Sequence, residues 1–306
     1  MRYITGTTKF CLEGPGAVSL GKFDGMHRGH QKLLEHVLAK QQEGMNGIFF
    51  TFDQFPGNVL EHMKMPLIMT NEERRTYLEQ RGLDVLIECP FVNEVIHLSP
   101  EDFVREILVN ELHAKYVVMG TDFHFGYKAA GDAEFLVRVS PRYGFTTEVI
   151  DKVMYENEEI SSTYVRSMIS EGKMKTAEEL LGRPYNIYGN MCEVKNGRSG
   201  MSVPAIRVIP RPDKLLPPAG VYISICSIGG RRYRSITNIG NSFSEQAGEH
   251  RYLETYLFSR GEHITQGCIE IELYDYIRPE QKFATVEALT LQIQQDILLC
   301  KDFFSK

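Results

Sequence analysis

The apolar run Ala17-Val18-Ser19-Leu20, followed by Gly21-Lys22-Phe23-Asp24-Gly25-Met26-His27-Arg28-Gly29-His30, decides the fold of this chain. Its pattern predicts a buried strand, a tight glycine turn and the first turn of a helix. His27 and His30 are three residues apart, so they share one face of that helix. Unpaired backbone N–H groups and the positive end of the helix dipole favour anions there. The stretch is therefore predicted to bind phosphate.

The glycines of this stretch strengthen the prediction. Gly21, Gly25 and Gly29 have no side chain that would keep a polyphosphate away from the backbone, so the stretch suits ATP. Phe23 and Asp24 lie between the first two glycines and belong to the same expected ATP site. Asp24 either orients a histidine or forms the turn, because aspartate before glycine is an ordinary turn former. The whole arrangement resembles the signature of the nucleotidylyltransferase superfamily.

Short apolar runs alternate with amphipathic stretches from residue 17 to about 150. The strand candidates are residues 17–20, 48–52, 85–88, 116–119 and 146–150. The helix candidates include residues 30–41, 71–80 and 100–112, with Asn71 and Ser99 as expected caps. This alternation predicts a parallel α/β sheet.

The character of the chain changes after Pro184, where short β-rich runs are separated by glycine, proline and arginine clusters. We expect a domain boundary near residue 185. Residues 1–185 would form a Rossmann-like nucleotidylyltransferase domain, and residues 186–306 would form a small antiparallel β-barrel. The helical pattern of residues 285–299 is expected to close the barrel.

Composition sets the class of protein. The chain has 306 residues, 42% of them hydrophobic and 24% charged. These values are typical of a globular protein with two domains. A net charge of −6 does not favour binding to nucleic acid or to an anionic membrane. Without a long apolar run or a signal-like N-terminus, a cytoplasmic protein with small-molecule partners is expected. The sequence leaves the oligomeric state open.

Further motifs follow the histidine pair. They are Thr51-Phe52-Asp53, Gly120-Thr121-Asp122-Phe123-His124-Phe125-Gly126, Ile160-Ser161-Ser162-Thr163-Tyr164-Val165-Arg166 and Leu181-Gly182-Arg183-Pro184-Tyr185. In this order they resemble the bacterial bifunctional riboflavin kinase/FAD synthetase family over essentially the whole chain. The resemblance implies an α/β domain that transfers AMP from ATP to FMN and a barrel that phosphorylates riboflavin.

The resemblance also implies roles for single residues. His27 and His30 would contact phosphate, and ATP would be held from the far side by Ser161, Ser162, Thr163 and Arg166. A Ser-Ser-Thr run at a helix start offers hydroxyl and backbone donors to phosphate. An arginine one turn later adds a guanidinium group that can donate two charge-assisted hydrogen bonds to it. The ordinary alternative is a helix cap followed by a surface arginine. Mg²⁺ would assist as ATP and FMN, the substrates, react.

The residues expected near the flavin by resemblance are Phe52, Asp53, Asp122, Phe123 and Phe125. Their aromatic rings fit a hydrophobic core equally well. Gln54 and Phe55 stand where the family has proline and histidine, and His124 replaces an arginine, which removes a permanent charge. An adenylyltransferase with a different phosphorylated acceptor therefore stays an alternative.

The barrel half departs further from the family. Ala205 and Arg207 stand where a threonine and an asparagine would hold Mg²⁺ and phosphate, and neither side chain supplies a hard oxygen ligand. Glu254 matches the catalytic glutamate that accepts the riboflavin hydroxyl proton, although a lone strand glutamate is more often an exposed carboxylate. We expect weak or no riboflavin kinase activity. A flavin-binding or nucleotide-binding regulatory protein derived from this family is the other alternative.

Overall fold

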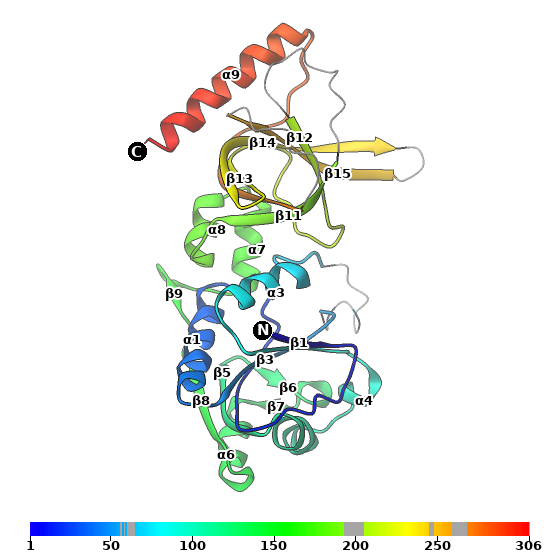
Figure 1. The fold of residues 1–306 in the computed structure, drawn as a ribbon, viewed down its shortest axis with the longest axis vertical. Coiled ribbons are helices and arrows are strands. Elements are labelled where there is room, and N and C mark those ends of the chain that lie inside the picture. Colours follow the sequence, from blue (N-terminus) through cyan, green and yellow to red (C-terminus); the bar gives the residue numbers. More distant parts are fainter. Residues whose placement is uncertain are drawn as a thin grey trace. The chain divides into compact units, whose positions relative to one another are not determined.

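The computed structural model describes residues 1–55, 57, 59, 65–192, 205–244, 248–258 and 268–305. These residues form two compact units, Met1–Ser162 and Thr163–Lys306 (Figure 1). Each unit has its own sheet or barrel and is described separately below.

A six-stranded sheet forms the centre of the first unit, in the order β1-β4-β3-β2-β5-β8. Every neighbouring pair in it is parallel. The strands are β1 (Arg2–Thr5), β2 (Gly16–Leu20), β3 (Asn46–Phe52), β4 (Val85–Cys89), β5 (Ala114–Gly120) and β8 (Thr146–Ile150). All residues of β2 and β4 are buried, as expected for strands that helices cover on both faces. The predicted parallel α/β sheet is confirmed.

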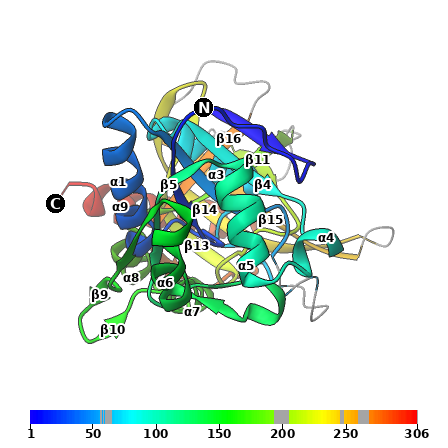
Figure 2. The same cartoon turned by 90° about the horizontal axis from the view of Figure 1, so that it is seen from below.

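Helices cover both faces of this sheet (Figure 2). Alternate strand residues point to opposite faces. Phe49 and Val118 pack with Leu34 of α1 (Arg28–Gln42) and Leu78 of α3 (Asn71–Gln80). On the other face, the strand residues pack with buried side chains of the π-helix η1 (Phe103–Glu111) and of α6 (Ala133–Tyr143). The result is a three-layer α/β/α unit.

Two predicted N-cap residues can be compared with the observed helix starts. Ser99 is the N-cap of α5 (Pro100–Asp102), and its hydroxyl accepts the Asp102 N–H. The cap of α3 is Thr70, so the expectation of Asn71 was wrong by one residue. Thr70 accepts the Glu73 N–H while the Glu73 carboxylate accepts the Thr70 N–H, a reciprocal capping box. Asn71 is thereby the first residue of the helix, with its side chain left for other contacts.

Smaller elements complete the first unit. They are α4 (Asn93–Ile96), β6 (His124–Phe125), η2 (Tyr127–Ala129), β7 (Gly131–Asp132), β9 (Met154–Tyr155) and β10 (Glu158–Glu159). β1 was not predicted, because its four residues are short and only partly buried at the edge of the sheet.

The second unit is a closed antiparallel barrel with the strand order β11-β12-β15-β14-β13-β16 (Figure 1). Its strands are β11 (Tyr185–Cys192), β12 (Ala205–Pro210), β13 (Gly220–Ile228), β14 (Arg231–Ser244), β15 (Gly248–Leu257) and β16 (Cys268–Arg278). The predicted barrel is confirmed, and α9 (Val286–Phe303) packs on it through Ile293 and Cys300. Arg278 on β16 anchors this helix by a bidentate pair with the buried Asp296, at 2.7 Å for the closest contact.

Two helices precede the barrel strands, α7 (Ser162–Ser170) and α8 (Met174–Leu181). α8 packs on β11 and β16, which groups it with the barrel. The two compact units therefore divide at residues 162 and 163, whereas the predicted domain boundary lies near residue 185. That boundary stays a prediction.

Candidate active site

The topology of the first unit marks one edge of its sheet. β2 lies between β3 and β5, so the chain builds the sheet outward from β2 in two directions. In open parallel sheets, ligands bind at the carboxyl ends of the strands where the strand order reverses. The loops that follow β2 and β5 carry residues 21–27 and 121–126, which include eight of the predicted site residues. Fold and motif thus indicate the same edge.

The loop after β2 is tightly wound. Phe23, Gly25 and Met26 have φ angles of 49°, 87° and 43°. These values lie in the left-handed region that favours glycine. A Cβ atom at Gly25 would lie 2.8 Å from Cγ2 of Ile68, so glycine is required here by space as well as by backbone conformation. At the start of the loop, the Gly21 N–H donates to the Phe50 carbonyl on β3.

The two histidines meet at the start of α1. His27 is the N-cap residue and His30 lies in the first turn. Their rings are stacked, with centroids 3.7 Å apart and an interplanar angle of 21°. Phe23 contacts His30 edge to face at 5.4 Å and stacks on Phe49 at 4.3 Å. The predicted pair therefore shares one face, held against an aromatic wall at an anion-favouring helix end.

The surroundings of His30 disfavour its charged form. Burial lowers the pKa of His30 well below its usual range, and the charges of His27 and Arg74 lower it further. Its Nδ1 atom is buried without a hydrogen-bond partner among the described residues. An imidazolium would bury an unpaired N–H at that position, so the neutral ring with its proton on Nε2 is favoured.

Asp24 fixes the loop in two directions. Its buried carboxylate accepts the Met69 N–H at 3.1 Å, which joins the loop to the start of α3. Its backbone carbonyl accepts the Ser162 hydroxyl at 2.9 Å. The predicted Ser161-Ser162 segment is thus brought to the histidine loop, although 138 residues separate Ser162 from Asp24.

The surroundings of Gly29 show that the chain at Ile160 lies close to the histidine loop. A Cβ atom at Gly29 would be 3.2 Å from the His27 ring and 3.9 Å from the carbonyl oxygen of Ile160. Thr163 and Arg166 lie on α7 within the second unit, with Arg166 one turn after Ser162. That they hold the same phosphate stays a prediction.

The aromatic residues predicted near the flavin fall into two groups. Phe125 is only 7% exposed and packs against the rings of Phe103, Phe123 and Phe135, so it is a core residue. Phe52 at the end of β3 and Phe123 after β5 are partly buried against the same hydrophobic cluster. These two rings lie on the sheet face opposite Phe23 and Phe49.

The two predicted aspartates differ in their surroundings. Asp53 accepts the Phe91 N–H on Oδ1 at 3.2 Å, and its backbone carbonyl accepts the side chain of Asn71 at 2.9 Å. Asp122 is exposed and its carboxylate lies 3.4 Å from Nζ of Lys152. His124 is exposed, and its Nδ1 lies 3.0 Å from the Asp122 carbonyl.

Comparison with known proteins matches both units. A family model for FAD synthetase matches residues 12–164, and one for riboflavin kinase matches residues 181–304. The chain is 31% identical over 302 residues to a bifunctional riboflavin kinase/FMN adenylyltransferase of Buchnera aphidicola, covering 96% of each chain. Homologues with the same name in Bacillus subtilis and Listeria monocytogenes are 32% and 31% identical, covering 93% and 94% of this chain and 91% and 92% of theirs.

The chain belongs to the bifunctional riboflavin kinase/FMN adenylyltransferase family.

A solved structure shares the fold of the family over the whole chain. The crystal structure titled as a macrolide-efflux protein from Streptococcus pneumoniae has a TM-score of 0.81 and 24% identity, covering 98% of this chain and 99% of that one. At this identity the likeness supports the fold alone.

In the riboflavin kinase unit, Glu254 is paired with a cation. Glu254 on β15 is in register with Arg207 on β12 and with Asn238 on β14. Nη2 of Arg207 lies 3.6 Å from Oε1 of Glu254, and the Tyr256 hydroxyl donates to Oε2 at 3.1 Å. The Arg207 guanidinium also lies over the Tyr252 ring at 4.7 Å. Arg207, which stands where the resemblance implies an asparagine, therefore lies beside Glu254.

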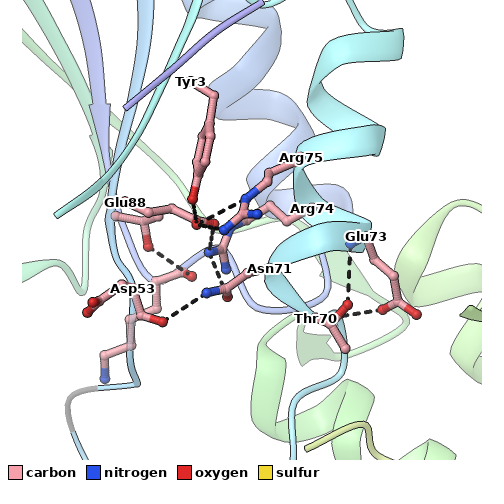
Figure 3. Close-up of polar contacts among 10 residues, drawn as sticks. Tyr3, Asp53, Thr70, Asn71, Glu73, Arg74, Arg75 and Glu88 are labelled. Carbon is pink, nitrogen blue, oxygen red and sulfur yellow. Dashed lines mark hydrogen bonds and ion pairs between the residues drawn. The ribbon is translucent and has the colours of Figure 1, made fainter. Parts of the chain in front are cut away.

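A buried polar network next to the histidine loop was missed by the sequence reasoning (Figure 3). It joins Arg74, Arg75 and Asn71 of α3 to Glu88 of β4 and to the Asp53 loop. Only the charged run 72–75 next to Thr70 signalled it, and such runs usually form a solvated helix face.

Two further features concern metal binding and membranes. Within the described ranges, no three His, Cys, Asp or Glu side chains come together as a metal site. In the same ranges, no helix has the length and apolar character needed to cross a bilayer.

Proposed function

We propose that this chain makes FAD by transferring AMP from ATP to FMN with release of pyrophosphate. The stacked pair of His27 and His30 at the start of α1, joined through Asp24 to Ser162, is the observation that carries the proposal. Its family membership supports the reaction, since the relatives are named for FMN adenylyltransferase activity. The substrates are small molecules, and a cytoplasmic location without nucleic-acid partners is part of the proposal.

The reaction requires the protein to position the two substrates and to neutralise phosphate charge. It does not require a general base. The FMN phosphate is ionised near pH 7 and attacks the α-phosphorus of ATP in line with the leaving pyrophosphate. The backbone N–H groups of the α1 start and the Nε2–H of His30 would hold phosphate oxygens. Arg166 would add a permanent charge.

Mg²⁺ would enter with ATP. The groups of the loop are imidazoles, backbone N–H groups and a hydroxyl, and the Asp24 carboxylate already accepts the Met69 N–H. This donor set fits phosphate oxygens, whereas Mg²⁺ prefers hard oxygens and commonly takes them from substrate phosphates. Bound in this way, Mg²⁺ neutralises developing charge.

The acceptor would lie over the same sheet edge. Phe52 and Phe123 offer partly exposed rings there, on the face opposite the histidines. An isoalloxazine ring prefers such aromatic and apolar surfaces. FMN would then reach across the strand ends toward ATP.

The decisive experiment is to incubate the purified full chain with FMN, ATP and MgCl₂ and to separate the products by chromatography. FAD and pyrophosphate are expected in equal amounts, and excess EDTA should abolish both. Equal pyrophosphate release with nicotinamide mononucleotide in place of FMN would favour a different acceptor. Binding of FMN and ATP without any product would favour the regulatory alternative.

We further propose that the barrel of this chain has weak or no riboflavin kinase activity. A general base must be free to take the proton of the attacking hydroxyl. Glu254 is instead engaged by Arg207 and Tyr256. The stretch 193–204, which precedes Ala205 and includes part of the expected phosphate loop, lies outside the described residues.

A further inference from the structure

We infer that Asn71 is a positioning residue of the adenylyl-transfer site: its side-chain amide holds the loop at Asp53, beside the proposed flavin site, against the helix start that also anchors the histidine loop. This role rests on the proposed function. Asn71 is not among the residues proposed to touch ATP or FMN, so its effect would be on how the two substrates meet.

The side chain of Asn71 is not needed to begin α3. Thr70 is the N-cap residue, and its reciprocal pair with Glu73 already satisfies two N–H groups at this helix end. Asn71 makes two other contacts. Nη2 of Arg74 donates to Oδ1 of Asn71 at 2.9 Å, and Nδ2 of Asn71 donates to the carbonyl of Asp53 at 2.9 Å (Figure 3). The second contact joins segments that are 18 residues apart.

Arg74 fixes the direction in which the Asn71 amide points. A guanidinium only donates hydrogen bonds and a backbone carbonyl only accepts them, so the amide oxygen must face Arg74 and the amide nitrogen must face Asp53. Arg74 is itself held in place, because it is 4% exposed and pairs with Glu88, which is fully buried on β4 (Figure 3). The sheet therefore holds the Asp53 carbonyl through two side chains.

The same helix start holds the histidine loop. The Met69 N–H, two residues before Asn71, donates to the buried Asp24 carboxylate at 3.1 Å. Ile68 is 2% exposed and lies so close to Gly25 that a Cβ atom there would be 2.8 Å from it. This short segment therefore contacts the loop after β2 and, through Asn71, the loop after β3.

The bond from Asn71 acts at the point where the chain leaves β3. Within the strand, the Thr51 hydroxyl donates to the Lys22 carbonyl of the histidine loop at 3.3 Å. Two residues later, two other hydrogen bonds hold Asp53 to the chain around the end of β4. Asn71 adds the link from Asp53 to the helix that braces the histidine loop.

In-line attack makes the proposed reaction sensitive to this spacing. The FMN phosphate must approach the α-phosphorus of ATP from the side opposite the leaving pyrophosphate, and a displacement of about 1 Å can slow a reaction by about 100-fold. ATP is proposed to bind at the histidine loop, whereas Asp53 borders the proposed flavin site. Loss of the Asn71 bond would leave the ATP contacts in place and change the separation of the two substrates.

The test compares N71D with N46D in the full chain. The carboxylate introduced by N71D can still accept from Arg74 and suits the first turn of a helix, but it cannot donate to the Asp53 carbonyl. N46D is the matched control: the Asn46 amide donates to the Glu13 carbonyl at 2.7 Å, at the opposite end of β3 from the site. Both substitutions remove one bond from a side-chain amide to a backbone carbonyl.

We expect N71D to lower the maximal rate of FAD formation, at saturating FMN and MgATP, by about 10- to 100-fold. The dissociation constant of MgATP, measured by calorimetry without FMN, should be unchanged in N71D, because the Met69 N–H still anchors Asp24. N46D should change neither quantity. If N71D does not fold, N71A removes the same donor without adding a charge and should show the same split between rate and ATP binding.

Two results would overturn the inference. One is a maximal rate in N71D equal to that in N46D. The other is a loss of MgATP binding in N71D as large as its loss of rate, because that result would indicate general damage to α3 and not a change in the meeting of the substrates.

Binding of FMN tests the inference without the reaction. In the presence of α,β-methylene-ATP, whose α–β bridge is not cleaved, FMN should bind about threefold or more weakly to N71D than to wild type or N46D. A wild-type chain that binds both ligands but forms no FAD from ATP would contradict the proposed function and leave this comparison readable. Equal FMN affinity in the three proteins would contradict the inference, and a chain that binds no FMN would contradict both.

Discussion

The guanidinium of Arg207 lies 3.6 Å from the carboxylate of Glu254, on strands that place the two residues directly opposite each other. We predict that the wild-type chain forms no more FMN from riboflavin and MgATP than the variant E254Q does. The double variant A205T/R207N, which restores the family's oxygen ligands, should form FMN faster than E254Q, because Glu254 is released and Mg²⁺ regains ligands. Ordinary FMN production by the wild type that E254Q loses would contradict this.

His30→Ala should lower the rate of FAD formation by about 100-fold or more, because it removes a preorganised donor to the phosphates. Stopped assays of FAD by chromatography would measure the loss. His36→Ala is the control on the same helix: His36 pairs at the surface with Glu148 at 3.3 Å and should leave FAD formation unchanged. Equal losses in both variants would point to damage of α1.

Gly25→Ala should lower the free energy of unfolding by about 2–4 kcal/mol, because it combines backbone strain with a steric clash. The residue has a φ of 87°, and its Cβ would meet Ile68 at 2.8 Å. Gly44→Ala shares the positive φ, at 94°, but its Cβ meets nothing within 4 Å. Backbone strain alone should then cost about 1–2 kcal/mol. Urea unfolding would measure both, and a smaller loss in Gly25→Ala than in Gly44→Ala would argue against a close-packed loop.

Glu88→Gln should destabilise the chain by about 3–5 kcal/mol, because it leaves the buried Arg74 without its counter-charge. Glu79→Gln removes only an exposed pair with the N-terminal amine and should change the stability by at most about 1 kcal/mol. Chemical denaturation at neutral pH would show the difference. Similar stability of the two variants would mean that Arg74 is not held as the structure indicates.

Phe125→Ala and Phe123→Ala should distinguish a residue of the hydrophobic core from a residue of the proposed flavin site. Phe125 is buried among three rings, so its loss should cost about 3–5 kcal/mol of stability. Phe123 is partly exposed, so its removal should mainly raise the KM for FMN. Thermal unfolding together with FMN saturation curves would measure these effects, and unchanged FMN binding in Phe123→Ala would remove that ring from the proposed flavin site.

Local patterns in the sequence determined much of the first unit. The run from Ala17 to His30 predicted a strand, a turn and a helix start, and residues 16–42 form these elements. The spacing of His27 and His30 predicted a shared face because helix geometry is local, and their rings stack. Residues 71–80 form the helix expected there, although its cap is Thr70.

Contacts between distant parts of the chain were beyond that reasoning. Asp24 and Ser162 are 138 residues apart, and their hydrogen bond forms only when the loop before α1 meets Ser162 in the folded chain. Arg207 and Glu254 were both noted in the sequence, but only the strand register made them partners. Phe125 suited a core or a flavin site equally until the sheet face was known.

The order of the motifs indicated the family. The sequence by itself also predicted the alternation of strands and helices in the first unit and the placement of two imidazoles on one helix turn, because propensity and periodicity act over a few residues. The tertiary structure alone decided which charges are buried together. Burial decides whether a histidine keeps its proton and whether a glutamate is free to act as a base, and burial depends on segments that meet only after folding.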